Sequence, residues 1–122
     1  MSKKKKESPR YPDNLVFRYL GFDWTIKFLD LSTEDFGETD GDQKEIRIYY
    51  KGMSDQNVID CIIHELGHVV MFELADPVFH YDTETNMKRE ENLIRLTSPR
   101  IFSIIRDNIE LAEFILKRIK EL

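Results

Sequence analysis

The sequence predicts an α+β protein in which a small N-terminal sheet packs on helices from the C-terminal part. Segments within residues 15–50 alternate apolar and polar side chains, as half-buried strands do. An apolar segment with a helix-start signal follows over residues 54–75, and residues 86–122 have helical periodicity. Strands followed by helices indicate an antiparallel or mixed sheet of two to four strands, a buried central helix and one or two C-terminal helices.

Length and charge are typical of one domain with a basic arm. The chain has 122 residues, of which 41% are hydrophobic and 34% charged, as in globular proteins. Residues 1–10 carry five of the 18 basic residues and one of the 23 acidic residues. We expect residues 1–14 to be a disordered basic arm and lead-in, and residues 15–122 to be a single domain. The body is acidic and no aromatic residues interleave the lysines, which argues against a nucleic-acid partner.

Three features of the sequence bear on where in the cell the protein is located. No apolar run reaches the roughly 20 residues of a membrane span, and no apolar segment follows MSKKKK as in a secretory signal. Cys61 is the only cysteine, so neither an intrachain disulfide nor a cysteine-based zinc cluster can form. We therefore expect a cytoplasmic protein without a membrane partner. No pattern indicates an oligomeric state.

Three segments read as strands, over residues 15–20, 22–28 and 44–50. Gly21 can turn the chain between the first two, and residues 30–43 are polar enough to predict a loop. The residues expected to face inward are Phe22, Trp24, Ile26 and Phe28 in the second strand and Ile46, Ile48 and Tyr50 in the third.

The C-terminal half of the sequence contains residues that typically start or end helices. Ser54 is a suitable N-cap for a helix over residues 55–75, which is apolar on nearly every face and is therefore expected to be buried. A loop over residues 78–85 leads to a second helix from about Asn86. Ser98 and Pro99 predict a kink or a fresh helix start. Asn108 marks a further possible break before the last helical segment.

The segment CIIHELGHVV, residues 61–70, contains the residues most able to bind a metal or catalyse a reaction. His64 and His68 are four residues apart, so a helix places both imidazoles on one face, within reach of a single metal ion. Glu65 lies about 100° around the helix from His64, beside such a metal. This HExxH pattern predicts two zinc ligands and a general base. The alternative is a pair of core histidines bonded to carboxylates, since buried polar groups need partners.

A catalytic zinc usually has three protein ligands and a fourth position for water. A histidine six residues after His68 is excluded, because Leu74 stands there. The remaining options are His80 in the predicted loop and Glu90 or Glu91 at the start of the second helix. Helical periodicity favours Glu91, then Glu90, then His80, because Glu91 continues an inward apolar stripe.

With these residues the chain resembles the gluzincins, the thermolysin-like zinc peptidases with two histidines and a downstream glutamate. It is most similar to their small single-domain members, the minigluzincins and related metallopeptidases often encoded by bacteriophages. The resemblance covers about residues 20–108. It rests on LGFDWTIKFLD, on DFGETDGDQKEIRI as an edge strand, on IIHELGHVV, on EENLIRL and on RDN. HELGH is the most specific of these pieces.

The resemblance implies a zincin-like fold and a zinc-dependent metallopeptidase that holds one Zn²⁺ per chain. His64, His68 and Glu91 would be the ligands. Glu65 would be the catalytic base, and Gly67 would let the glutamate helix approach closely. Zinc-activated water would then hydrolyse peptide bonds.

A peptide or protein substrate is expected to add as an extended strand along the edge formed by residues 44–50, with Ile46, Ile48 and Tyr50. His80 and Tyr81 are candidate donors to the developing oxyanion. An alternative function is that of a zinc-binding but proteolytically inactive interaction or scaffold protein on the same fold.

Overall fold

A four-stranded mixed sheet and three helices make up the computed structural model, which describes residues 11–74 and 86–122 and the side chains of residues 11–73 and 97–122. The α+β class predicted from the sequence is confirmed. The strands are β1 (Asn14–Tyr19), β2 (Phe22–Leu29), β3 (Gly37–Asp40) and β4 (Glu45–Tyr49). The helices are α1 (Asp55–Leu74), α2 (Asn86–Asp107) and α3 (Ile109–Lys120).

The sheet has the strand order β1-β2-β4-β3. β1 and β2 form an antiparallel hairpin, whose turn uses positive φ angles at Leu20 and Gly21. β2 and β4 run parallel, with Ile26 opposite Ile46, and β3 and β4 are antiparallel. β1 and β3 are therefore the edge strands, and β4 is an inner strand.

β3 lies inside the segment that was predicted to be a loop. Gly, Glu and Asp are poor strand formers, so the sequence GETD carries no local strand signal. Its strand conformation comes from pairing with β4, in a register that sets Glu38 opposite Arg47. Arg47 Nη1 then contacts Glu38 Oε1 at 2.9 Å, and Nη2 contacts Asp40 Oδ2 at 3.3 Å.

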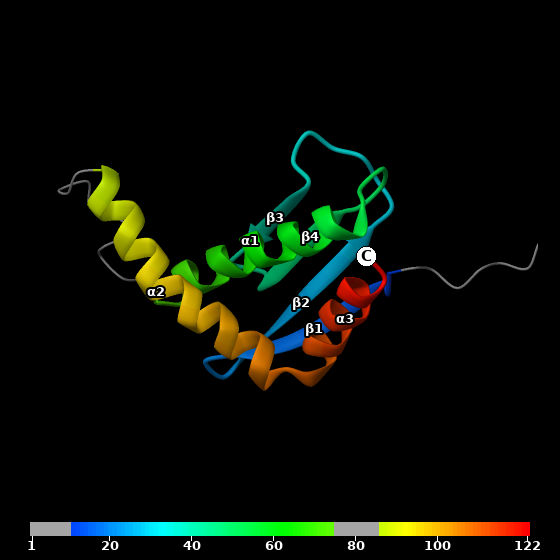
Figure 1. Cartoon of the computed structure of the whole chain (residues 1–122). Helices are drawn as coiled ribbons and strands as arrows, with labels where there is room; N and C mark the ends of the chain where they lie inside the picture. Colours follow the sequence, from blue (N-terminus) through cyan, green and yellow to red (C-terminus); the bar gives the residue numbers. More distant parts are fainter. Residues whose placement is uncertain (1–10, 75–85) are drawn as a thin grey trace, which may run out of the picture.

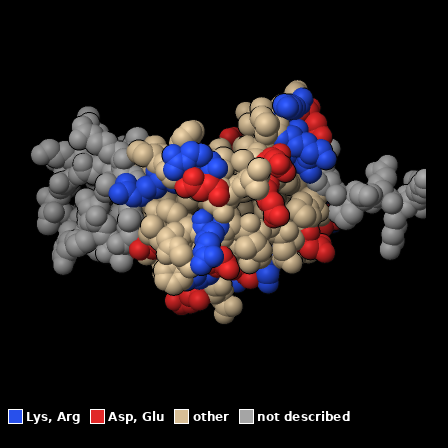
Figure 2. Space-filling view, turned by 90° about the horizontal axis from the view of Figure 1, so that it is seen from below, with Lys and Arg blue, Asp and Glu red and all other residues tan. Residues whose placement is uncertain are grey.

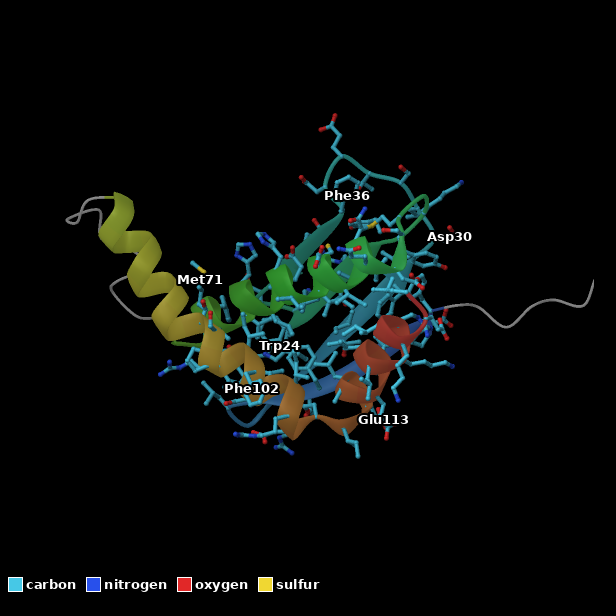
Figure 3. The ribbon with its side chains drawn as sticks, in the orientation of Figure 1. Trp24, Asp30, Phe36, Met71, Phe102 and Glu113 are labelled. Carbon is cyan, nitrogen blue, oxygen red and sulfur yellow. The ribbon has the colours of Figure 1, made fainter. Side chains whose placement is uncertain are left out.

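The core lies between one face of the sheet and the helices. Figure 1 shows α1 and α3 over this face, with α2 crossing one end of α1. Trp24, labelled in Figure 3 between α1 and the strands, is buried, as are Ile26 and Phe28. Phe22 was expected to face inward but is exposed, because it lies at the β1–β2 turn, where Lys44 Nζ is 4.4 Å from its ring centroid.

α1 begins as predicted, with the Asn57 N–H donating to Ser54 Oγ at 3.2 Å. The expectation that it is buried on all sides is wrong. Two of its apolar residues, Ile63 and Phe72, are exposed. The helix packs on the sheet with one side only, and the buried residues of that side are Val58, Ile59, Ile62, Leu66, Val69 and Val70.

The N-terminal lead-in contributes to the core. Tyr11 is buried, its ring stacks on Phe28 with centroids 5.6 Å apart, and its hydroxyl donates to the Asp55 carboxylate. Part of the segment expected to be a lead-in therefore packs into the core through Tyr11. Residues 1–10, which carry the four lysines, lie outside the described residues.

α2 continues through Pro99 without a break, so the predicted fresh helix start is wrong. Proline lacks the N–H that would bond the carbonyl four residues earlier, yet the helix persists. In the turn that follows, the Ser103 hydroxyl donates to the Pro99 carbonyl at 3.0 Å. The break predicted at Asn108 is confirmed, since α2 ends at Asp107 and α3 begins at Ile109.

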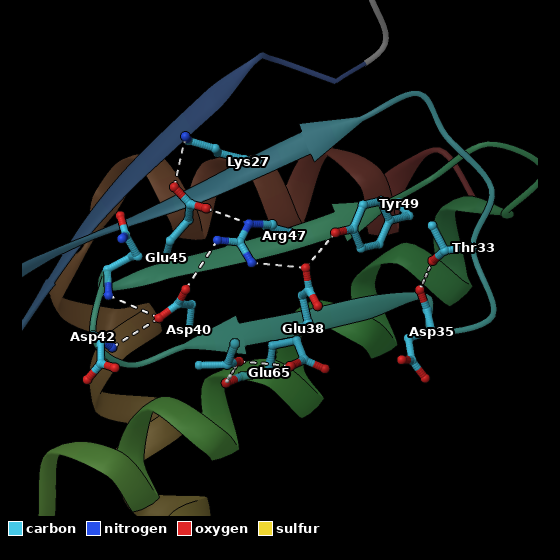
Figure 4. Close-up of polar contacts among 12 residues, drawn as sticks. Lys27, Thr33, Asp35, Glu38, Asp40, Asp42, Glu45, Arg47, Tyr49 and Glu65 are labelled. Atoms are coloured by element: carbon cyan, nitrogen blue, oxygen red, sulfur yellow. Dashed lines mark hydrogen bonds and ion pairs between the residues drawn. The ribbon is translucent and has the colours of Figure 1, made fainter.

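The opposite face of the sheet is polar. Arg47 contacts three carboxylates from β3 and β4, and Lys27 Nζ lies 2.8 Å from Glu45 Oε1 (Figure 4). Hydrogen bonds from Tyr49 and Arg47 lower the pKa of Glu38, and Lys27 lowers the pKa of Glu45. Figure 2 shows another side of the molecule, seen from below, on which basic and acidic side chains are also interspersed. None of the helices in the described part is long and apolar enough to cross a membrane.

Candidate metal centre

His64 and His68 meet on the exposed side of α1. Their Nε2 atoms are 3.2 Å apart, and the rings are nearly perpendicular, with centroids separated by 4.9 Å. The two rings are close because residues four positions apart lie on the same face of a helix, about one turn apart. Both side chains are exposed, and that of His64 is 69% accessible. The expectation that this pair sits in a buried helix is therefore wrong.

The spacing of the two nitrogens fits a metal ion. Zinc binds imidazole nitrogen at about 2.0–2.1 Å, so two ligands at a tetrahedral angle lie about 3.3–3.4 Å apart. The observed 3.2 Å is close to this separation. Both Nε2 atoms point to one locus on the solvent side of the helix, and with a Glu65 oxygen they form a group within 4.8 Å.

Glu65 is the buried member of the group, with 4% of its surface exposed. Thr39 Oγ1 donates to Glu65 Oε1 at 2.8 Å and lies 3.3 Å from the Glu65 carbonyl oxygen (Figure 4). The other carboxylate oxygen, Oε2, is 4.0 Å from His64 Nε2. One oxygen is thus held by β3, while the other faces the imidazole pair.

Thr39 is a site residue that sequence reasoning missed. It lies in the segment predicted to be a loop, and no motif links it to HExxH. The one available signal is alternation: once β3 is recognised as a strand, Glu38 and Asp40 face the polar side and Thr39 faces α1.

Close packing of β3 on α1 depends on Gly37. A Cβ atom at this position would lie 2.6 Å from Cys61 Sγ and 3.2 Å from the Arg47 carbonyl oxygen. The absence of a side chain lets the edge strand reach the helix turn that precedes His64. Burial, with a smaller effect of Glu65, raises the pKa of the Cys61 thiol to about 11, so the thiol is neutral at pH 7.

Two open clefts flank the histidines along the groove between β3 and α1, and both are lined by Gly37, His64 and Glu65. One has a volume of about 680 Å³ and extends toward Phe36 and Met53. The other has a volume of about 390 Å³ and extends toward His68 and Phe72. A ligand lying along β3 would pass from one cleft to the other in front of Glu65.

At the end of this groove near Phe72, Lys44 links the β3–β4 turn to α1. Its Nζ lies 2.8 Å from Glu73 Oε1, in the last turn of α1. The same ammonium lies within 4.4–5.2 Å of the ring centroids of Phe22, Phe72 and Trp24, a distance at which cations and aromatic faces attract. This contact ties the β3–β4 turn to α1.

The predicted substrate edge is wrong. Ile46 and Ile48 are fully buried and lie on the inner strand β4, which pairs with β2 on one side and β3 on the other. Tyr50 follows β4, donates its N–H to the Leu29 carbonyl at 3.0 Å and packs against Tyr11. The edge beside the histidines is β3.

The third ligand is not defined by the described side chains. Glu90 and Glu91 lie in the N-terminal part of α2, whose side chains before Thr97 are outside the described part. His80 and Tyr81 also lie outside the described residues. Gly67 does face α2, but the nearest described atom to a Cβ there is Ile101 Cδ1 at 3.9 Å, so these residues leave room for a methyl group.

Comparisons with protein-family models, with curated proteins and with solved structures find no match to this chain. The functional argument therefore rests on the chain's own residues. The decisive ones are the two convergent imidazoles and the buried carboxylate that β3 holds beside them.

Proposed function

We propose that this chain is a zinc-dependent metallopeptidase on a zincin-like fold, related to the gluzincins. The observation that carries the proposal is the 3.2 Å separation of His64 Nε2 and His68 Nε2, with the buried carboxylate of Glu65 beside them. Both rings are exposed, which argues against core histidines bonded to carboxylates. The same separation also allows a direct hydrogen bond between the two imidazoles, so the metal content of the protein decides between these two explanations. A purely structural zinc site would not need Glu65.

His64 and His68 would hold the metal through Nε2, and Glu91 is the first candidate for the third ligand, ahead of Glu90 and His80. A bound zinc ion would supply Lewis acidity and lower the pKa of a water molecule toward about 7. The exposed setting of both imidazoles suits a catalytic site, which keeps one position open for water and substrate.

Glu65 would act as the general base. Its Oε1 already accepts a hydrogen bond from Thr39, whereas Oε2 faces the histidines. Oε2 would take a proton from the attacking water and pass it to the leaving amine. The hydrogen bond from Thr39 fixes the rotamer of the carboxylate, so that no reorientation is needed before each proton transfer.

The substrate would be an extended peptide that pairs with the outer edge of β3, which no strand in the described part of the chain covers. This edge runs between the two clefts, and its backbone groups can pair with an added strand. β3 replaces the inner strand β4 in this role. The proposal therefore moves substrate contacts from Ile46 and Ile48 to the backbone of residues 37–40.

The test measures metal and cleavage in the same preparations. We expect untagged protein to contain near one zinc per chain, and either Glu91→Ala or Glu90→Ala, but not both, to lose it. We expect Glu65→Gln to keep zinc and lose cleavage of an unfolded protein substrate. Protein that binds no zinc even after zinc is added back would overturn the proposal.

A second candidate is a zinc-binding scaffold without peptidase activity. The openness of both clefts favours it, because the described residues build little wall around a substrate. This candidate predicts one zinc per chain and no cleavage of any unfolded substrate. Zinc binding together with cleavage that depends on Glu65 would exclude it.

A further inference from the structure

α3 has two apolar sides, and only one of them faces the core. Leu111 and Ile115 are buried against the domain. On a neighbouring side, Ile109, Leu116 and Ile119 are 71%, 51% and 50% exposed. Together with Ala112 they form a stripe whose residues are separated by three, four and three positions. This is the spacing of a helix that packs along another helix.

Charged residues follow one flank of this stripe in an ordered way. Glu110 and Glu113 lie in the N-terminal half of α3, and Lys117 and Lys120 lie in the C-terminal half. Figure 3 shows Glu113 on the outer side of α3. The helix dipole favours such an order in any isolated helix. It does not explain why an exposed apolar stripe runs beside the charges.

We propose that this stripe is an interface on which α3 packs antiparallel against α3 of a second copy of the chain. A twofold axis between Ala112 and Leu116 would place Ile109 opposite Ile119 of the second copy, and Ala112 opposite its Leu116. The acidic half of each helix would then lie along the basic half of the other. A parallel pair would turn the two charged flanks to opposite sides of the seam, so that no such charge pairing would form. A twofold interface requires such a self-complementary surface.

The size of the surface sets the strength of the association. A helix of 12 residues is about 18 Å long, and a single pair of such helices buries less than the roughly 1,200–2,000 Å² of a stable dimer. The dimer is therefore reversible and forms at high protein concentration. The interface lies on α3, whereas the histidines lie on α1, so the inference does not depend on the peptidase proposal.

The first experiment measures mass against concentration by sedimentation equilibrium of the full chain. We expect the weight-average mass to rise from 14.6 kDa toward twice this value as the concentration approaches about 1 mM. Leu116→Glu should raise the dimer dissociation constant at least about tenfold, because it places a charge in the apolar seam. The control Val16→Thr changes an equally exposed apolar residue on β1 and should leave the constant unchanged.

The second experiment tests the orientation by charge reversal. One variant carries Lys117→Glu and Lys120→Glu, and the other carries Glu110→Lys and Glu113→Lys. Each should be monomeric alone, with an unchanged circular dichroism spectrum, and their equimolar mixture should recover the dimer. A wild-type chain that stays monomeric up to about 1 mM, or a dimer insensitive to Leu116→Glu, would overturn the proposal. A mixture that fails to associate would overturn the antiparallel arrangement.

Discussion

The strands at the two edges of the sheet, β1 and β3, meet their surroundings in different ways. On β1, the Asn108 side chain takes the place of a further strand. Its Oδ1 accepts from the Arg18 N–H at 2.7 Å, and its Nδ2 donates to the Arg18 carbonyl at 3.0 Å. No described strand or side-chain amide covers the outer edge of β3 in this manner. That edge is only four residues long and carries Glu38 and Asp40.

Unpaired edges tend to attract other strands, and proteins protect them by covering, shortness or charge. β1 is protected by covering, which leaves no backbone group at Arg18 for a ligand. β3 is protected by shortness and charge, which keep its backbone accessible beside His64 and Glu65. The difference indicates that the sheet has one structural edge and one edge suited to binding. The predictions below alter each edge in turn.

The largest effect is expected at the carboxylate beside β3. Glu65→Gln keeps the shape of the side chain and the hydrogen bond from Thr39, through the amide oxygen, but removes the base. If the proposed function holds, the rate of peptide cleavage falls about 10²–10⁴-fold. Zinc content, measured by elemental analysis, stays at the wild-type value. Asp107→Asn, an exposed carboxylate in the last turn of α2, is the control and keeps full activity. Wild-type cleavage by Glu65→Gln would remove this residue from the role of base.

The next effect concerns the contact from β3 to that carboxylate. Thr39→Val removes the hydroxyl that donates to Glu65 Oε1 and leaves a buried carboxylate oxygen without this partner. We expect kcat to fall about tenfold and the free energy of unfolding to fall by about 1–3 kcal/mol. KM should change little, because the proposed substrate contacts are made by the backbone of β3. Thr39→Ser keeps the donor and should restore kcat. Equal kcat values for the valine and serine variants would contradict a positioning role for Thr39.

Features set by neighbouring residues in the chain could be predicted from the sequence, whereas features set by long-range pairing of strands could not. The meeting of His64 and His68 could be predicted from their spacing on a helix. The break between α2 and α3 could be predicted from Asn108, a residue that favours helix ends. β3 and Thr39 could not be predicted, since GETD becomes a strand only through its pairing with β4 and its contacts with Arg47. The identity of the edge depends on the parallel pairing of β2 with β4, which no local pattern encodes. The helix partner of α1 is likewise a long-range property, which is why the third ligand stayed open between Glu90, Glu91 and His80.

At the covered edge, Asn108→Ala removes three side-chain hydrogen bonds, two to Arg18 and one to the Ile104 carbonyl. We expect the free energy of unfolding to fall by about 2 kcal/mol. Asn108→Asp keeps the acceptor for the Arg18 N–H but sets a carboxylate oxygen against the Arg18 and Ile104 carbonyls, so its loss should be at least as large as that of Asn108→Ala. Chemical denaturation measures both variants. Zinc content and cleavage should not change, because this edge is remote from the histidines. A loss of zinc in Asn108→Ala would show that the two edges are not independent.

The smallest effect is expected where β3 touches α1. Gly37→Ala places a methyl group 2.6 Å from Cys61 Sγ, so the strand or the thiol must shift. Overpacking costs about 1–3 kcal/mol, while alanine in place of glycine restricts the unfolded chain and returns about 0.4–1 kcal/mol. The net loss of unfolding free energy should be about 1 kcal/mol. Combining it with Cys61→Ala removes the sulfur and should recover part of this loss, whereas the Arg47 carbonyl at 3.2 Å limits the recovery. A double-mutant cycle measured by thermal unfolding tests this coupling. Strictly additive effects of the two substitutions would mean that the edge strand reaches the helix without depending on this contact.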